Sequence, residues 1–72
     1  MKRRELERRL RKEGFRVDRK KKHIIYVHPE DPRKEPVAVP HALYVKKGTA
    51  MGIIKKLENI LRRVNREEKL AA

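Results

Sequence analysis

One histidine, His23, stands where it could take part in phosphate chemistry. Four consecutive basic residues, the last three being Lys20, Lys21 and Lys22, come directly before it, and the strand-like run IIYV follows. Cleavage of a phosphodiester by a neighbouring hydroxyl needs a base, an acid for the leaving oxygen and positive charge near the phosphorane oxygens. His23 could transfer the proton and the lysines could supply the charge, and a nearby ammonium favours the neutral imidazole that a base requires. The alternative interpretation is a solvated hairpin turn that contains an incidental histidine.

A second basic group, Lys46 and Lys47, comes shortly before Thr49, which we expect to cap a helix that begins at Ala50. The free N–H groups and the positive dipole end of a helix bind anions, and two lysines add to that field. Gly52, in the first turn, would let a phosphate or another backbone approach closely. We therefore take Lys46, Lys47 and Thr49 as candidate phosphate-binding residues, the alternative being an ordinary threonine cap with solvated lysines.

The other two histidines are weaker candidates. His28 shares one strand face with Ile24 and Tyr26, which favours a structural role with its hydrogen bonds satisfied at the edge of the sheet. His41 follows Pro40 in a loop, where it could contact phosphate or simply water.

No metal ion and no cofactor is expected. The histidines lack a paired spacing such as H-E-x-x-H, and the sequence contains no cysteine and no Gly-rich phosphate loop. Glu30 and Asp31 are adjacent carboxylates, but they lie in a Pro-rich turn, where solvated side chains are more typical than acid–base catalysis.

The charge of the chain points to a polyanionic partner. Among 72 residues, 22 are Lys or Arg and 10 are Asp or Glu, which gives a formal net charge of +12. The excess is concentrated in residues 1–22. Such a balance is the electrostatic signature of a protein that binds nucleic acid by neutralising phosphates.

Length and composition set further limits. A chain of 72 residues predicts one domain with a small core and no room for a cofactor domain. Neither an apolar run of membrane-spanning length nor a signal-peptide core is present, so we expect a cytoplasmic protein. Lys, Arg and Glu are abundant while Ser, Gln, Cys and Trp are absent, a bias that suits a thermophile and an idealised designed sequence alike.

The elements that must position these residues follow from periodicity and turn chemistry. Leu6 and Leu10 predict an amphipathic helix, flanked by Glu5–Arg9 and Glu7–Arg11 pairs and ended by Gly14. Alternation and β-branched residues predict the strands, prolines predict the loop, and a long apolar stripe predicts the last helix. The expected elements are a helix at 2–13, strands at 15–18, 23–28 and 37–39, a loop at 29–36, a helix at 50–64 and a frayed tail at 65–72, with residues 1–64 forming the domain.

The predicted fold class is α+β, with the order α-β-β-β-α. A three-stranded antiparallel sheet with both helices on one face would bury both apolar helix stripes and leave the other sheet face open. Alternation puts His23, Ile25 and Val27 on one face of the central segment. If these residues face outward, Ile25 and Val27 form an exposed apolar patch beside the histidine, which is typical of a protein interface.

Several segments, in this order, resemble the HicA-type toxins of toxin–antitoxin pairs. They are ELERRLRKEGF, a basic turn into HIIYVHP, VAVP, and LYVKKGTAMGIIKKL, and they cover about residues 3–61. The resemblance implies a fold like that of double-stranded-RNA-binding domains. It also implies a metal-independent RNA-cleaving enzyme with a single catalytic histidine, and an antitoxin that covers this histidine. Counting back from His28-Pro29, His23 occupies that position.

The turn before His23 departs from the family pattern. The family has Gly-Ser before its histidine, whereas this chain has Lys21-Lys22, and counted from Gly14 the turn is one residue short. Without glycine, the turn loses easy access to positive φ, so its geometry must differ. The sequence therefore predicts an mRNA-cleaving toxin with His23 as catalytic residue, with RNA and an antitoxin or a second copy as partners. The alternatives are a non-catalytic RNA-binding relative and a designed scaffold whose charge serves solubility.

Overall fold

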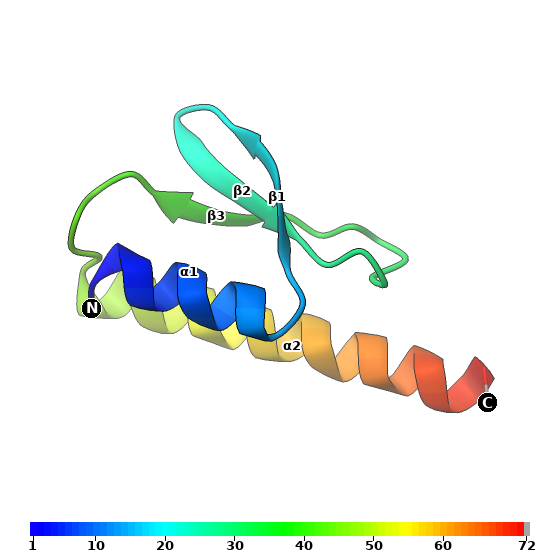
Figure 1. Cartoon of the computed structure of the whole chain (residues 1–72). Coiled ribbons are helices and arrows are strands. Elements are labelled where there is room, and N and C mark those ends of the chain that lie inside the picture. The colour runs from blue at the N-terminus through cyan, green and yellow to red at the C-terminus, as the bar shows by residue number, and fades with distance from the viewer. Residues whose placement is uncertain (72) are drawn as a thin grey trace.

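Two helices and three strands follow one another in the predicted order α-β-β-β-α (Figure 1). The computed structural model describes the backbone of residues 1–71 and the side chains of residues 1–66. The elements are α1 (Arg3–Lys12), β1 (Arg16–Lys20), β2 (His23–Val27), β3 (Val37–Pro40) and α2 (Lys47–Ala71).

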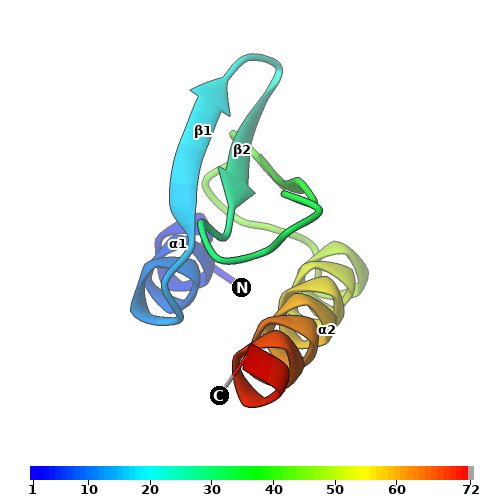
Figure 2. The same ribbon diagram turned by 90° about the vertical axis from the view of Figure 1, so that its right-hand side faces the viewer.

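The strands form one antiparallel sheet in the order β1-β2-β3, and both helices lie on the same side of it (Figures 1 and 2). The two helices run side by side in the same direction. Because both helices lie on one side of the sheet, one face of β2 meets the helices and the other face stays open. This arrangement confirms the predicted fold class.

The core lies between the helices and the inner face of β2 and β3. Ile24 and Tyr26 on β2 pair in register with Val39 and Val37 on β3, and all four side chains are buried. The apolar stripe predicted for the last helix faces this layer, since Ile53, Leu57, Ile60 and Val64 are buried in α2, as are Leu6 and Leu10 in α1.

α1 ends at a glycine in the way that the sequence predicts. Gly14 has a φ of 93°, its N–H donates to the Arg11 carbonyl at 3.0 Å, and the Phe15 N–H donates to the Leu10 carbonyl at 2.9 Å. These two bonds define a Schellman motif, which satisfies carbonyls that the helix end leaves free. A Cβ on Gly14 would lie 3.0 Å from Nε2 of His28. The glycine therefore lets the end of α1 approach the end of β2 closely.

The second helix begins earlier than expected. α2 starts at Lys47, and the Ala50 N–H already donates to the Lys46 carbonyl at 2.8 Å. Thr49 therefore lies inside the first turn, and the prediction that it caps a helix from Ala50 is wrong. The helical backbone also continues through residues 65–71, beyond Val64. The side chains of 67–71 and all of residue 72, where the expected frayed tail falls, lie outside the described residues.

β1 differs from the half-buried strand that the alternation of residues 15–18 indicated. Every residue of β1 is exposed, and the buried residue of this segment is Phe15, directly before the strand. The register shifts between Val17 and Arg19, so Asp18 is an extra residue in this strand. A bulge of this kind disrupts alternation and increases twist. The β1–β2 hairpin projects away from the helices, which leaves its edge strand without a covering layer (Figure 2).

The loop after β2 is fixed by a carboxylate that we expected to be solvated. Asp31 is fully buried, and Arg63 of α2 donates to both of its oxygens at 3.0 Å. The N–H groups of Arg33 and Glu35 donate to the same carboxylate at 3.1 and 3.0 Å. Burial by itself would raise the pKa of Asp31, but these hydrogen bonds and the guanidinium of Arg63 hold it below its ordinary value. Asp31 anchors the Pro-rich loop to α2.

Candidate functional site

His23 is the first residue of β2 and its side chain is exposed. Its backbone carbonyl accepts a hydrogen bond from the Lys21 N–H at 3.0 Å, and its Cα lies opposite Pro40 of β3. Within residues 1–66, no hydrogen bond or ion pair engages its imidazole. The backbone of His23 is therefore held in place, while both ring nitrogens remain available to a ligand.

The residues of β2 lie on the two faces of the strand that the alternation predicts. Ile24 and Tyr26 are buried against the helices, whereas Ile25 and Val27 are half-buried on the face that also carries His23. Residues opposite one another in an antiparallel pair share a face. The open face therefore consists of Arg16 and Arg19 of β1, His23, Ile25 and Val27 of β2, and Ala38 and Pro40 of β3.

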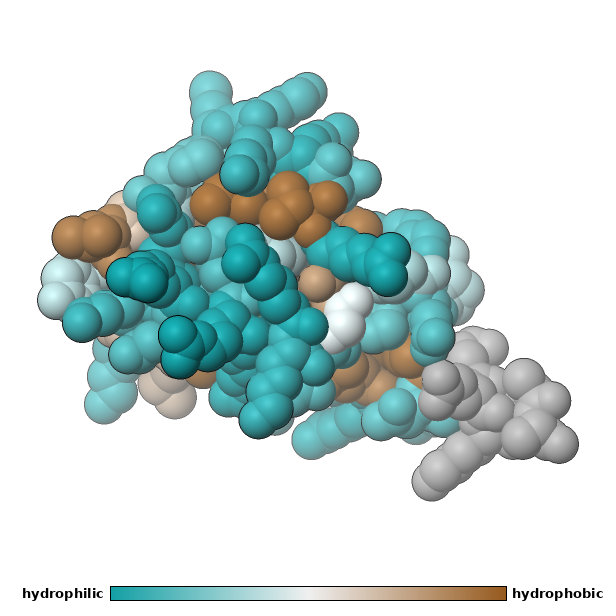
Figure 3. Space-filling model, viewed as in Figure 1, coloured by the Kyte–Doolittle hydropathy of each residue, from teal (hydrophilic) through white to brown (hydrophobic). Residues whose placement is uncertain are grey.

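The surface over the strands is not uniformly charged. Apolar side chains gather over the strand region in Figure 3, with hydrophilic residues on either side of them. An apolar centre with a polar border is typical of a surface that another molecule covers.

The turn that precedes His23 carries free positive charge. Lys20, Lys21 and Lys22 are all exposed, and none of them is paired with an acidic side chain of residues 1–66. Neither Lys21 nor Lys22 has a positive φ, so the turn closes without the left-handed residue that a glycine would supply.

His41 lies against this turn, which the sequence did not reveal. Its Nε2 is 2.9 Å from the Lys21 carbonyl oxygen, and its own carbonyl accepts a hydrogen bond from the guanidinium of Arg3. We had expected His41 to contact phosphate or water. The ring stays exposed, and the structure places it between the turn before His23 and the N-terminal end of α1.

His28 has the structural role that its strand face predicts. It is buried, its Nδ1 accepts a hydrogen bond from the Glu30 N–H at 3.1 Å, and its ring stands edge-on to Phe15 with the centroids 5.1 Å apart. Because both the ring and its Nδ1 are engaged inside the protein, His28 is not part of the candidate site.

Lys46, Lys47 and Thr49 lie apart from the turn. All three are exposed, at the start of α2 in the helical layer, while the β1–β2 turn lies at the far end of the hairpin (Figure 1). A Cβ on Gly48 or Gly52 would meet no atom within 4 Å, so this end of α2 is open on those sides. The structure thus presents two separate basic groups rather than one.

A third basic group, which the sequence analysis missed, follows the outer side of α1. Arg4, Arg8 and Arg11 are exposed, and two shallow clefts of about 230 and 250 Å³ lie among them. Their i, i+4, i+7 spacing was the available signal.

Those two predicted ion pairs, Glu5–Arg9 and Glu7–Arg11, are not formed. Glu7 pairs with Arg3 at 3.4 Å and accepts a hydrogen bond from the Tyr26 hydroxyl at 2.7 Å. Burial, and then this hydrogen bond, raise the pKa of Tyr26 to about 12. Arg9 reaches Glu58 of α2 at 3.5 Å. Glu7 is thereby used inside the fold.

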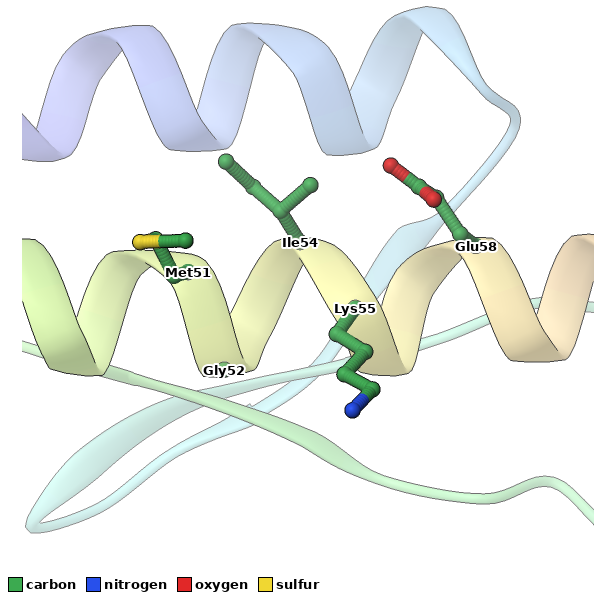
Figure 4. Close-up of a pocket in the computed structure, with 5 residues that line it drawn as sticks. All are labelled: Met51, Gly52, Ile54, Lys55 and Glu58. Carbon is green, nitrogen blue, oxygen red and sulfur yellow. The ribbon is translucent and has the colours of Figure 1, made fainter.

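One further hollow lies on α2. It is lined by Met51, Gly52, Ile54, Lys55 and Glu58, and the side chains of Ile54 and Glu58 point toward α1 (Figure 4). It contains no histidine and belongs to the helical layer, so we do not assign the chemistry to it.

Neither a cluster of metal ligands nor a membrane-spanning helix is seen in the described part of the chain. No three His, Cys, Asp or Glu side chains cluster there as ligands for a metal ion. None of the helices among residues 1–71 combines the length and the apolar character needed to cross a bilayer.

The fold and this face define a small basic α+β domain with a histidine at the start of the central strand of an open sheet. A family model described as the HicA toxin of bacterial toxin–antitoxin systems matches residues 3–58, which is most of the chain. The protein therefore belongs to the HicA toxin family, whose members are paired with an antitoxin. None of the curated proteins and none of the solved structures matches the chain.

Proposed function

We propose that this protein is an endoribonuclease toxin that cleaves mRNA, with His23 as its catalytic residue. One observation carries the proposal: a member of the HicA family presents a histidine directly after three lysines, Lys20 at the end of β1 and Lys21 and Lys22 in the turn, and within residues 1–66 neither the histidine ring nor the lysines have a side-chain partner. We expect it to act in the cytoplasm, where its mRNA substrate is found.

The reaction requires no group that the chain lacks. A base removes the proton of the 2′-OH, the 2′-oxygen attacks phosphorus, and the bond to the 5′-oxygen breaks as that oxygen takes up a proton. The products are a 2′,3′-cyclic phosphate and a 5′-OH end. His23 transfers the proton, and Lys20, Lys21 and Lys22 stabilise the negative charge that develops on the phosphorane oxygens.

The remaining basic groups bind the phosphate backbone of the RNA. Lys46 and Lys47 stand at the N-terminal turn of α2, where backbone N–H groups and the helix dipole attract anions, and the hydroxyl of Thr49 adds a donor. Arg4 and Arg8, together with Arg11, add a row of charge along α1. Contacts of this kind give affinity that depends on salt and not on sequence.

The open sheet face binds the antitoxin. Ile25 and Val27 form its apolar centre, and Arg16 and Arg19 stand beside them on β1. An acidic partner with an apolar ridge would complement both the charge and the centre of this face, and it would cover His23. A second copy of this basic chain fits less well, because like charges would meet across the interface.

The experiment is to incubate the purified chain with mRNA in excess EDTA and to analyse the ends of the fragments. We expect cleavage to continue, with 2′,3′-cyclic phosphate and 5′-OH ends, because the reaction uses only the imidazole and the lysines. Cleavage that stops in EDTA, or fragments with 5′-phosphate ends, would contradict the proposed mechanism.

A second function is favoured by one observation, the turn of Lys21 and Lys22, which contains no glycine and no positive φ. If this turn holds His23 away from the scissile phosphate, the chain is a non-catalytic RNA-binding relative. It would then bind RNA with the same dependence on salt and leave it intact under every condition.

A further inference from the structure

We propose that His41 is a positioning residue: it holds the β1–β2 turn in place, and through the turn it sets the position of His23. The proposal rests on the function proposed above. It gives a role to a histidine that the reaction does not otherwise use.

The contact between His41 and the turn has a defined direction. Nε2 of His41 lies 2.9 Å from the Lys21 carbonyl oxygen, a good hydrogen-bond distance. A carbonyl oxygen can only accept, so the ring nitrogen must donate. The imidazole therefore carries its proton on Nε2 when it is neutral. The charged ring can donate in the same way, so protonation does not break the contact.

His41 is itself fixed from the other side. Its carbonyl accepts from the guanidinium of Arg3, and the Arg3 N–H donates to the Leu43 carbonyl at 3.0 Å. The N-terminal amine of Met1 donates to the Val45 carbonyl at 3.0 Å, and the Val45 N–H donates to the Met1 carbonyl at 2.7 Å. The segment that carries His41 is thus attached to the N-terminus of the chain and gives the ring a firm support.

The turn has few other restraints. The last β1–β2 pair is Lys20 with Ile24, so the exposed Lys21 and Lys22 close the hairpin directly before His23, which is the first residue of β2 and lies opposite Pro40 of β3. The hydrogen bond from the Lys21 N–H to the His23 carbonyl ties the turn to itself but not to the rest of the protein. The bond to His41 attaches the carbonyl of that same Lys21 to another segment. Loss of this bond would let the turn move relative to the open sheet face, and the hydrogen bond between Lys21 and His23 would pass that movement to His23.

The experiment compares two variants of the full chain, His41→Leu and His41→Gln. Leucine removes the donor, whereas the amide of glutamine offers an N–H group at a similar reach. We expect His41→Leu to lower kcat by up to about 10²-fold, which is typical when a catalytic group moves by ~1 Å. KM should stay unchanged, because the ring does not bind RNA. His41→Gln should retain most of the wild-type kcat.

Several results would overturn the proposal. A His41→Leu variant as active as the wild type would show that the contact has no role. Equal losses in the two variants, or a raised KM with an unchanged kcat, would mean that the ring itself contacts RNA.

Amide hydrogen exchange separates this proposal from the proposed function. If the wild-type chain does not cleave RNA, the nuclease proposal fails, but the exchange rates of the Lys21, Lys22 and His23 amides still decide the role of His41. They should be faster in His41→Leu than in the wild type and in His41→Gln, and equal rates would overturn it. Should His41→Leu fail to fold, the tautomer of the neutral His41 ring in the wild-type protein decides. A proton on Nδ1 would exclude the hydrogen bond to Lys21 and overturn the proposal.

Discussion

At the scale of single residues, the three histidines differ in what surrounds them. His28 is enclosed by Phe15 and a backbone N–H, and His41 is engaged by a backbone carbonyl, whereas the ring of His23 has no hydrogen bond within residues 1–66. A general base must reach the proton that it removes from the substrate. Of the three, His23 is the one that presents an unengaged ring at the surface, which is why we assign the chemistry to it.

The ionisation of Asp31 contributes to the stability of the fold. Its pKa lies below the ordinary value of 3.8 when the protein is folded. A carboxyl group with a lowered folded pKa stabilises the fold at pH values above its unfolded pKa, and this contribution is lost as the pH falls through the folded pKa. At neutral pH the contribution is complete.

We therefore predict that Asp31→Asn lowers the free energy of unfolding at pH 7 by about 3 kcal/mol, as breaking a buried ion pair typically does. The gap between wild type and variant should narrow as the pH falls from the unfolded pKa of Asp31 toward its lower folded pKa, because the carboxyl group then takes up a proton in the wild type too. Urea unfolding at several pH values measures both effects. Glu30→Gln, at the exposed neighbouring position, is the control and should change stability by no more than about 0.5 kcal/mol. A gap that stays constant down to acid pH would contradict this role for Asp31.

At the scale of elements, the two helices each contain or adjoin a glycine, and the two positions differ in whether the fold needs a glycine there. Gly14 ends α1 with a φ of 93° and lies close to His28, whereas Gly52 is inside α2 with open space around it. Position 14 needs glycine because of its positive φ and because a side chain there would meet His28. Position 52 has neither constraint.

We predict that Gly14→Ala destabilises the protein by at least 1–2 kcal/mol, the cost of a left-handed conformation together with contact against His28. Gly52→Ala should instead stabilise it by roughly 0.5–1 kcal/mol, the difference in helix propensity between the two residues. Thermal and urea unfolding of the two variants, made side by side, provide the measurement. A stabilising Gly14→Ala would mean that the Schellman motif at the end of α1 is wrongly assigned.

The elements could be predicted from the sequence wherever the pattern that defines them lies within one short stretch of the chain. The spacing of Ile53, Leu57 and Ile60 predicts the buried face of α2, and the alternation around Ile24 and Tyr26 predicts which side of β2 is open. Those signals depend only on a neighbouring stretch of chain.

What could not be predicted depends on residues far apart in the sequence. Asp31 was expected to be solvated because its partner, Arg63, is 32 positions away, and the contact of His41 with Lys21 spans 20 positions. The bulge at Asp18 was hidden as well, because register is a property of two strands together.

At the scale of the whole molecule, the two layers have separate surfaces. The sheet presents an apolar centre and a histidine, and the helices carry basic residues at the start of α2 and along α1. We infer that RNA and antitoxin compete at the sheet, while the helical layer adds affinity for RNA alone. The antitoxin would then block access to His23 without having to neutralise the entire charge of +12.

We predict that a variant with Ile25→Lys and Val27→Lys no longer co-purifies with an antitoxin encoded by the adjacent reading frame when the two are expressed together. Lysine at these half-buried positions removes the apolar centre of the face. The control is Met51→Lys, which alters an exposed apolar residue of α2 and should leave the complex intact. An intact complex with the double variant, or a double variant that no longer folds, would show that this face is not the interface we describe.

The most direct test of the central claim is the cleavage rate of His23→Ala, measured together with its affinity for RNA across a series of salt concentrations. We expect cleavage to fall by roughly 10²–10⁴-fold, the usual cost of losing a general acid or base. Stability should change by no more than about 0.5 kcal/mol, because the side chain is exposed. The affinity should fall with salt as steeply as in the wild type, because the basic residues that contact phosphate are unchanged. A His23→Ala protein that cleaves RNA at the wild-type rate would contradict the account, and a wild-type protein that binds RNA but never cleaves it would establish the non-catalytic alternative.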